Sequence, residues 1–430
     1  MRKTLAQVTL PKHYKRNFWC LAGDFGFFGI GLAFIGSSTV IPSFLTALQT
    51  PAFVIGLMST LQSACWLLPQ LFAARYLADK EYMKPHILWP AGLGRSLLLV
   101  MAVLIWITGA QPAWLIIALM TLVVIGFWVG DGLASVPWFD FLSKVIPATR
   151  RGRLTSTGQT LSGIFGFLVG FAVEWMLSDR GLAFPNNYAS LFFLAFVMLA
   201  LSFLSLSFGI EEKGISSHKV PSWREYIPQL WEVLKHDRTY RRYIITRQIY
   251  GLSALASPFY MTYALDRLGL PSQVAGRYTS IGVIGSILAA MIFGWMNERY
   301  GSKRVIVIGI AITTLIPIYA LLAPSLFPDP AWLAWGYGLV FFFFNMSMSS
   351  MMPGWITYVL EHAPEAKRPT YVGLTNTING INMLFSALGG VILQWSGSNY
   401  HLLFGITIAG VLLAWPVSLS LPEPRHRQTT

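Results

Sequence analysis

Three ionisable residues interrupt long apolar stretches of this chain: Asp24, Arg95 and Asp131. A charge in the middle of a bilayer costs roughly 2.5–3.5 kcal/mol on insertion scales, so it needs a partner or a water-filled cavity. If the stretches are helices, all three residues lie about 9–12 Å below the same membrane surface. Two carboxylates that share one guanidinium could bind and release a proton or another cation. The alternative is a structural ion pair, in which Arg95 neutralises one acid and the other acid faces water.

Two further ionisable residues lie near the ends of apolar stretches. Glu174 is a candidate for the same charge network, although its position also fits a boundary residue in contact with water. Arg247 either extends its long side chain to the membrane surface or contacts an anionic substrate. The sequence leaves both alternatives open.

Polar, aromatic and flexible side chains in other apolar stretches are candidates for contact with a small molecule. Residues 341–355 combine four consecutive Phe with several Met, and methionine surfaces adapt to varied apolar guests. This pattern favours a lipophilic or amphipathic ligand. Ordinary packing and helix–helix polar contacts are the alternative. The candidate ligand contacts are Gln62, Trp66, Gln159, Arg247, Tyr250, Tyr260, Asn345, Met348, Asn376 and Asn379.

The composition indicates a helical membrane protein. Of the 430 residues, 54% are hydrophobic and 11% are charged, and the mean hydropathy is +0.56. A soluble surface needs far more charge. A span requires about 20 apolar residues, and its backbone must form its hydrogen bonds internally, so each span is predicted to be a helix. The twelve predicted spans are 18–40, 52–76, 87–108, 112–137, 154–177, 187–210, 241–265, 273–296, 304–323, 331–360, 370–395 and 401–421.

The second half of the chain repeats the plan of the first. Trp138, Pro147, Arg151 and Thr160 are matched by Trp355, Pro364, Arg368 and Thr377, and both stretches join the fourth and fifth spans of their half. Duplicated bundles are typical of secondary transporters. We therefore predict an all-α integral membrane fold with twelve transmembrane helices in two pseudo-symmetric six-helix bundles. The predicted parts are a cytoplasmic tail (1–17), a first bundle (18–210), a cytoplasmic linker with an amphipathic helix (211–240), a second bundle (241–421) and a second tail (422–430).

The charge distribution predicts the orientation. The net charge is +13, and Lys and Arg concentrate in the two tails and the even-numbered loops. This positive-inside pattern predicts a multi-pass protein of the cell inner membrane with both termini in the cytoplasm, and it argues against nucleic-acid binding. Cys20 and Cys65 both lie within spans, and no cofactor or metal site is predicted. Common catalytic motifs are absent from the sequence, so no enzymatic activity is predicted.

A charged turn follows the second span of each half. It reads GWMNERYGSKR at 294–304 and, in a less regular copy, RYLADKEYMK at 75–84. The acidic–basic–x–Gly–x–basic order resembles the signature loop of the major facilitator superfamily, and the resemblance covers nearly the whole chain. It implies that acids in these turns latch one conformation with basic companions. The implied latch residues are Asp79, Lys80, Glu298 and Arg299, with Lys84 and Lys303 nearby, and Arg151 and Arg368 in the repeated stretch.

The resemblance implies secondary active transport by alternating access, in which two halves rock about a central site. The methionine-rich lining favours proton-coupled efflux of a lipophilic or amphipathic solute. Cation-coupled uptake of a sugar or metabolite is the alternative, because GDFG at 23–26 is similar to the start of sodium/sugar symporters. A lipid flippase and a non-transporting receptor or scaffold are alternatives of other classes. The expected partners are the lipid bilayer, a small-molecule substrate and a proton or sodium ion, and the chain is expected to be monomeric.

Overall fold

The computed structural model describes residues 11–77, 80–213, 232–364 and 367–424. Within these ranges every regular element is a helix, and eleven segments are long and apolar enough to cross a membrane. The predicted all-helical membrane fold is therefore confirmed. Most of the predicted linker helix, and the predicted latch acid Asp79, lie outside the described residues.

The first half of the chain forms one helical bundle. Helix α1 packs against α6 and α7, and α4 packs against α5 and α7. Apolar side chains on one face of α1, such as Ile30 and Phe34, join a core that includes Ala195 and Leu199 of α7. The helices of this bundle are α1 (Tyr14–Ile35), α2 (Val40–Ala47), α3 (Ala52–Tyr76), α4 (Lys84–Thr108), α5 (Ala113–Val145), α6 (Ala148–Met176) and α7 (Asn186–Ser207).

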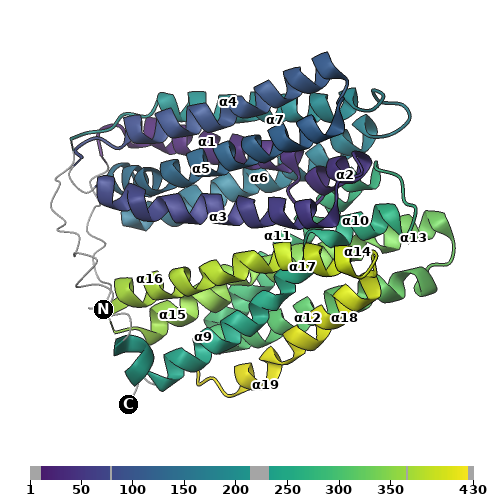
Figure 1. Ribbon diagram of the computed structural model, residues 1–430. Coiled ribbons are helices and arrows are strands. Elements are labelled where there is room, and N and C mark those ends of the chain that lie inside the picture. Colours follow the sequence, from purple (N-terminus) through teal and green to yellow (C-terminus); the bar gives the residue numbers. More distant parts are fainter. Residues whose placement is uncertain (1–10, 78–79, 214–231, 365–366, 425–430) are drawn as a thin grey trace.

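The second half forms the other bundle, in which α12 packs against α14 and α18. Figure 1 shows the bundles lying next to each other. Helix α1 begins and α19 ends at the same end of the molecule, which we call the termini end; the opposite end is the far end. The helices are α9 (Arg238–Gly251), α10 (Phe259–Asp266), α11 (Val274–Tyr300), α12 (Ser302–Leu326), α13 (Pro330–Gly336), α14 (Gly338–Ser349), α15 (Thr357–His362), α16 (Arg368–Asn379), α17 (Leu384–Trp395), α18 (Tyr400–Leu412) and α19 (Ala414–Leu419).

The described residues contain eleven candidate spans where twelve were predicted, and the predicted seventh span, 241–265, is not among them. It consists of α9, a 3₁₀ turn at Leu252–Leu255 and α10. The break lies just before Pro258, which has no N–H to donate to the preceding turn. The first span has a similar break at Gly36, whose φ of 51° ends α1 before α2 begins. The short helices α2 and α10 then pack against each other across the two bundles.

Three other spans of the second half are also interrupted along their length. A π-helical segment at Met351–Ile356 joins α14 to α15, and a 3₁₀ turn at Gly380–Met383 joins α16 to α17. The last span divides into α18 and α19. Such interruptions are common near functional sites in membrane proteins, because they free backbone groups and redirect side chains.

The two bundles meet at the far end, where glycines let the helices approach closely. A Cβ atom on Gly276 of α11 would lie 2.1 Å from the backbone nitrogen of Glu174 on α6, so only glycine fits. Hydrogen bonds join the halves here, from Ser280 Oγ to the Phe167 carbonyl (2.8 Å) and between the hydroxyls of Thr39 and Thr279 (2.9 Å). Figure 1 shows the bundles converging at the far end and diverging toward the termini end.

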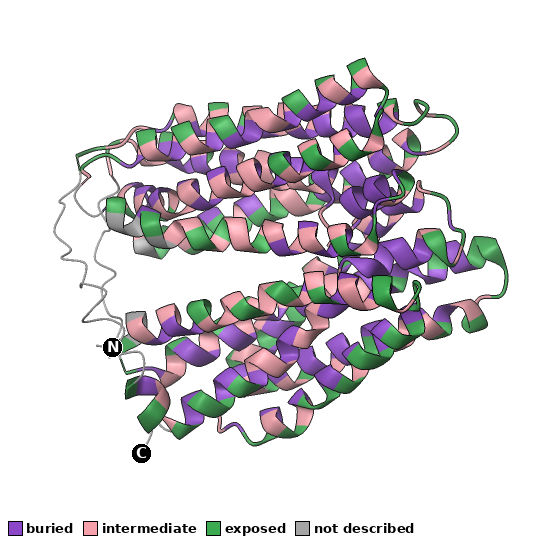
Figure 2. Ribbon diagram, in the orientation of Figure 1, coloured by how far each residue is buried: buried purple, intermediate pink, exposed green. Residues whose placement is uncertain are grey.

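Burial follows the same arrangement. Figure 2 shows buried residues inside each bundle and exposed residues along the outer helix faces. Many exposed side chains are large and apolar, including Ile107 (76% exposed) and Trp114 (70% exposed). An apolar outer surface is unfavourable in water but suits contact with lipid.

At the termini end of each bundle, a glutamate and a lysine form equivalent hydrogen bonds: Glu211 with Lys84 and Glu423 with Lys303. We call each pair a clamp. In the first, Glu211 accepts hydrogen bonds from the backbone N–H groups of Met83 and Lys84 at the start of α4, and Lys84 Nζ donates to carbonyls at the end of α7. In the second, Glu423 accepts from the N–H of Lys303 at the start of α12, and Lys303 Nζ donates to the Leu419 carbonyl. A carboxylate at a helix N-terminus satisfies free N–H groups and complements the helix dipole. The clamp ties the last helix of each half to its third span.

The contact at the far end yields a first prediction. In a variant with Cys20 and Cys65 replaced by serine, Thr39→Cys with Thr279→Cys should form a disulfide under mild oxidation, because the two hydroxyls are 2.9 Å apart. The cross-linked peptides can be identified by mass spectrometry. The control pair, Thr39→Cys with Thr377→Cys, combines Thr39 with a residue of α16, a helix that begins at the termini end, and should stay reduced. Cross-linking of the control pair in preference to the test pair would contradict the arrangement of the halves.

Candidate functional site

The first bundle contains a hydrogen-bonded charge cluster built on Asp24 in the middle of α1. Asp24 Oδ1 accepts a hydrogen bond from Ser202 Oγ of α7 (2.5 Å), and Oδ2 accepts one from Trp138 Nε1 of α5 (2.7 Å). The carboxylate is buried, with 4% of the residue exposed. Both oxygens are therefore held by neutral donors from neighbouring helices.

Arg95 of α4 links this carboxylate to a second one. Its Nη1 donates to Ser202 Oγ (3.0 Å), and its Nη2 lies 4.0 Å from Asp131 Oδ1. The guanidinium also lies over the ring of Phe28, at 5.2 Å from the centroid. The expected juxtaposition of Asp24, Arg95 and Asp131 is thus present. Asp24 accepts two short hydrogen bonds, whereas the contact of Asp131 with the shared cation is longer.

A cavity of about 310 Å³ lies against this cluster. Six of the thirteen residues that line it are aromatic, and the two acids, Arg95 and Ser135 supply polar groups. Trp66 of α3 belongs to this cavity and not to the one that contains Gln62, although the two residues are one helical turn apart. The lining includes Asp24, Phe25, Phe28, Trp66, Arg95, Trp128, Asp131, Trp138 and Phe139.

A larger cavity, of about 480 Å³, lies between the two bundles. The first bundle contributes small polar side chains from α3 and from the turn after α1. The second contributes Arg247 and Tyr250 of α9, Met348 of α14, and the region around the 3₁₀ turn after α16. We call it the central cavity; its lining includes Ser37, Ser38, Ser59, Gln62, Ser63, Arg247, Tyr250, Ser253, Ser257, Tyr260, Thr313, Phe344, Ser347, Met348, Met351, Asn379, Asn382, Met383 and Ser386.

Arg247 is positioned in the central cavity by aromatic rings. Its guanidinium lies 4.9 Å from the ring centroid of Trp355 and 5.3 Å from that of Tyr250. Tyr250 is itself fixed by a hydrogen bond with Ser347 Oγ (3.0 Å). The amide of Asn382 approaches the same turn and donates to the Arg247 carbonyl at 3.5 Å. The side chain therefore points into the cavity and not toward the membrane surface.

The structure distributes the predicted ligand contacts among several places. Gln62, Arg247, Tyr250, Tyr260, Met348 and Asn379 line the central cavity. Asn345 instead donates to the Phe341 carbonyl of its own helix (3.0 Å). Gln159 and Asn376 are exposed and are not among the residues that line the cavity. Their helices pass the cavity, but their positions lie closer to the termini end.

Glu174 does not belong to the cluster around Asp24. It lies near the far end of α6 and binds Arg277 of α11, whose Nε is 3.1 Å from Glu174 Oε1. Arg277 also lies 4.0 Å from the ring centroid of Trp335. The pair joins the two halves beside Gly276, so Glu174 contributes to closing the far end.

The predicted latch residues make local contacts in this conformation. Arg151 donates to the carbonyls of Ile146 (3.1 Å) and Ser143 (2.9 Å), which stabilises the turn between α5 and α6. Lys80 lies over the ring of Tyr76, and Arg299 lies near the rings of Trp295 and Tyr300. Glu298 is exposed, and the side chain of Arg368 lies outside the part of the chain that is described. The latch role of these residues stays a prediction.

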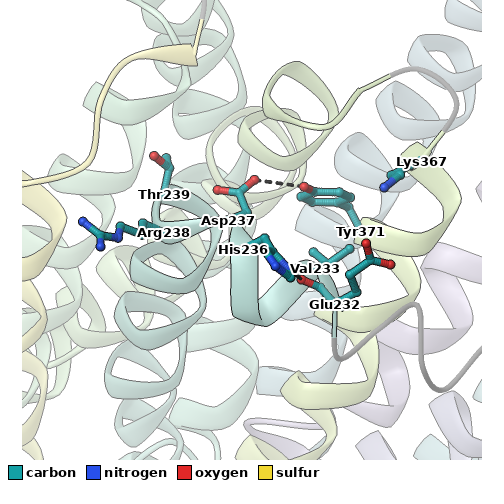
Figure 3. Close-up of a pocket in the computed structure, with 8 residues that line it drawn as sticks. All are labelled: Glu232, Val233, His236, Asp237, Arg238, Thr239, Lys367 and Tyr371. Carbon is teal, nitrogen blue, oxygen red and sulfur yellow. Dashed lines mark hydrogen bonds between the residues drawn. The ribbon is translucent and has the colours of Figure 1, made fainter.

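A polar pocket at the termini end was not predicted. Figure 3 shows Asp237 and Tyr371 facing each other across it. Asp237 Oδ2 accepts a hydrogen bond from Tyr371 Oη (2.9 Å) and lies 2.7 Å from His362 Nε2, and Oδ1 accepts from the Tyr240 N–H (2.8 Å). Asp237 thus caps α9 and joins it to α15 and α16. The position of Asp just before α9 was the available sequence signal.

Asp237 yields a second prediction. Burial by itself raises the pKa of this carboxyl, but hydrogen bonds from His362, the Tyr240 N–H and Tyr371 outweigh burial and lower the pKa to about 2. A lowered pKa stabilises the fold above the unfolded value of about 4, and the benefit is lost as the pH falls toward 2. Asp237 is only half-buried, so solvent screens part of this benefit, and Asp237→Asn should reduce stability at pH 7 by about 1 kcal/mol.

Thermal unfolding of the purified protein in detergent measures this effect. The difference between Asp237→Asn and the native protein should shrink as the pH falls from about 4 to about 2. Asp179→Asn is the control, because Asp179 is exposed and its removal should leave the pH profile unchanged. A difference of the same size at pH 7 and pH 2 would show that the carboxylate charge is not the cause.

Comparison with known proteins agrees with this architecture. The model of the family described as "Major Facilitator Superfamily" matches residues 165–387. An uncharacterized protein of Mycobacterium tuberculosis is 23% identical over 402 residues, covering 90% of this chain and 74% of that protein. Multidrug resistance protein 2 of Bacillus subtilis is 23% identical over 403 residues, covering 90% and 92%. The crystal structure of the nucleoside transporter NupG superposes with a TM-score of 0.66 at 14% identity, covering 94% of this chain and 99% of that one. The family match spans more than half of the 430 residues, and this chain therefore belongs to the major facilitator superfamily.

Proposed function

We propose that this secondary transporter moves a small amphipathic solute through the central cavity by alternating access, and that it exports the solute in exchange for protons. The observation that carries the proposal is the position of the cavity between the bundles, with both halves contributing to its wall. A solute bound there contacts both halves, so a rocking motion of the halves can expose it first to one side and then to the other.

The lining supports an amphipathic solute. Met348, Met351 and Phe344 provide an apolar, adaptable surface, whereas Gln62 and Asn379 provide hydrogen-bonding groups. The similarity to Multidrug resistance protein 2 of Bacillus subtilis is compatible with export. The positive-inside pattern predicts that the termini end lies in the cytoplasm. In that orientation the conformation described here, with the halves joined at the far end, faces inward.

The charge cluster in the first bundle is suited to proton coupling. Asp24 has two short hydrogen bonds from neutral donors, whereas Asp131 lies 4.0 Å from Arg95 and faces the aromatic cavity. We assign Asp131 as the proton carrier. Asp24 and Ser202 hold Arg95 in place, and Arg95 then controls how readily Asp131 takes up a proton.

A third prediction tests this assignment in proteoliposomes. With anionic, neutral and cationic amphipathic dyes as probes, an imposed pH gradient should drive accumulation of at least one dye by the native protein. Asp131→Asn should reduce the gradient-driven rate roughly tenfold or more, because a neutral amide cannot carry the proton, while exchange of dye without a gradient should continue.

Asp140→Asn is the matched control. Asp140 lies on the same helix and forms a surface ion pair with Lys144 (3.0 Å), so this variant should behave as the native protein does. The assignment is wrong if Asp131→Asn retains full coupling to the pH gradient. The transport proposal itself is wrong if the folded native protein moves none of the dyes, with or without a gradient.

A further inference from the structure

We infer that Arg247 binds a negatively charged group of the transported solute, which is then an organic anion with an apolar body. The inference rests on the proposed function, because it assigns a substrate class to the central cavity. Four observations support it. Arg247 has no acidic partner among the described residues, and the positions that match Arg95 and Asp131 carry no charge in the second half. The cavity lining combines apolar and polar side chains, and the Oδ1 atom of Asn382 accepts no hydrogen bond.

Arg247 lacks an acidic partner within the described ranges. The groups that face its guanidinium are the rings of Trp355 and Tyr250, and no carboxylate of the described residues lies within salt-bridge distance of it. Cation–π contacts compensate in part for the loss of water around a cation. A guanidinium still presents five N–H donors. A carboxylate would accept hydrogen bonds from them, whereas the aromatic rings do not replace those bonds.

The comparison of the two halves shows what is missing. Trp138 and Trp355 occupy matching places, and each contacts an ionisable residue on the first helix of its half: Trp138 contacts Asp24, and Trp355 contacts Arg247. In the first half, Arg95 lies 4.0 Å from Asp131 and shares Ser202 with Asp24, so a countercharge lies beside the acids. Among the described residues of the second half, none supplies a countercharge for Arg247.

Sequence spacing locates the positions that match Arg95 and Asp131. Arg95 is eleven residues after Lys84, and eleven residues after Lys303 is Thr314. Asp131 is seven residues before Trp138, and seven residues before Trp355 is Met348. A neutral hydroxyl and a thioether thus replace two charged groups. Arg247 is half-buried, and its charge faces the cavity that the solute enters.

The rest of the lining indicates the shape of the solute. Phe344, Met348 and Met351 lie on the same cavity as Arg247, and they suit a flat or flexible apolar group. Asn382 Oδ1 is buried and has no hydrogen-bond partner, so it is free to accept from a donor on the solute. A carboxylate, sulfonate or phosphate at Arg247 with an aromatic or alkyl body satisfies both parts of the lining.

A fourth prediction uses a matched pair of probes that differ in charge alone. We expect the purified protein to bind 2-naphthoate about tenfold or more tightly than the neutral 2-naphthamide, as measured by isothermal titration calorimetry at pH 7. Arg247→Gln should remove this preference by weakening naphthoate binding to the level of the amide. Arg247→Lys should retain part of it, because the charge remains but the planar donors are lost.

Arg242→Gln is the control, since Arg242 is an exposed arginine of the same helix and should not affect binding. Monodisperse elution and an unchanged unfolding temperature establish that each variant is folded. A further arm titrates phosphatidylglycerol, an anionic lipid, in place of naphthoate. Binding of the lipid but not of naphthoate, with loss in Arg247→Gln, would overturn the assignment to a free organic anion.

The inference is also overturned if naphthoate and naphthamide bind equally, if neither binds at millimolar concentration, or if Arg247→Gln keeps the preference for the anion. These results differ from a failure of the proposed function. Equal binding of the two probes with gradient-driven dye transport intact would leave transport standing and remove the anionic class. Binding of naphthoate at Arg247 without transport of any dye would support the anionic class and contradict the proposed transport function.

Discussion

The structure depends on one constraint, which is that a charge within an apolar interior must be compensated. The first bundle meets this constraint internally, because Asp24, Ser202 and Arg95 form a connected network that reaches Asp131. The contact between the bundles meets it with the pair of Glu174 and Arg277. Arg247 is compensated only by aromatic rings among its described neighbours. A transporter can use such a charge, because a bound solute supplies the missing countercharge and then leaves again.

The two halves share a framework but differ in chemistry. Both contain the clamp of a late glutamate and an early lysine, Glu211 with Lys84 and Glu423 with Lys303, so the framework of the second half repeats that of the first. Their interiors have diverged, since the first holds a cluster of two acids and one base and the second lines the central cavity with an arginine and amides. In the proposed mechanism, this division separates ion coupling from solute binding, while the close helix contacts at the far end join the two halves.

The sequence predicted the helices, and the position of each charge along its helix, more accurately than it predicted which helices are neighbours. Equal depth in the membrane was enough to suggest that Asp24, Arg95 and Asp131 meet, because each helix advances by a constant rise per residue. Depth alone could not place Glu174, whose partner Arg277 comes from the other half of the chain. For the same reason, the sequence wrongly grouped Gln62 with Trp66. The two residues lie one turn apart on α3, but they line different cavities. Glu211 and Glu423 were missed because their hydrogen bonds connect residues more than a hundred positions apart.

By itself, the sequence determined the membrane class, the all-helical architecture, the duplication and the depth of each charge, because these follow from hydropathy, backbone hydrogen bonding and residue spacing. Only the tertiary structure decided which charges are paired, where the halves touch and which side chains line the central cavity. Which charges pair, and which side chains line the cavity, depends on the rotation of each helix about its axis and on breaks such as the one between α9 and α10. Both are set by packing between segments that are distant in the chain, and no local pattern records that packing.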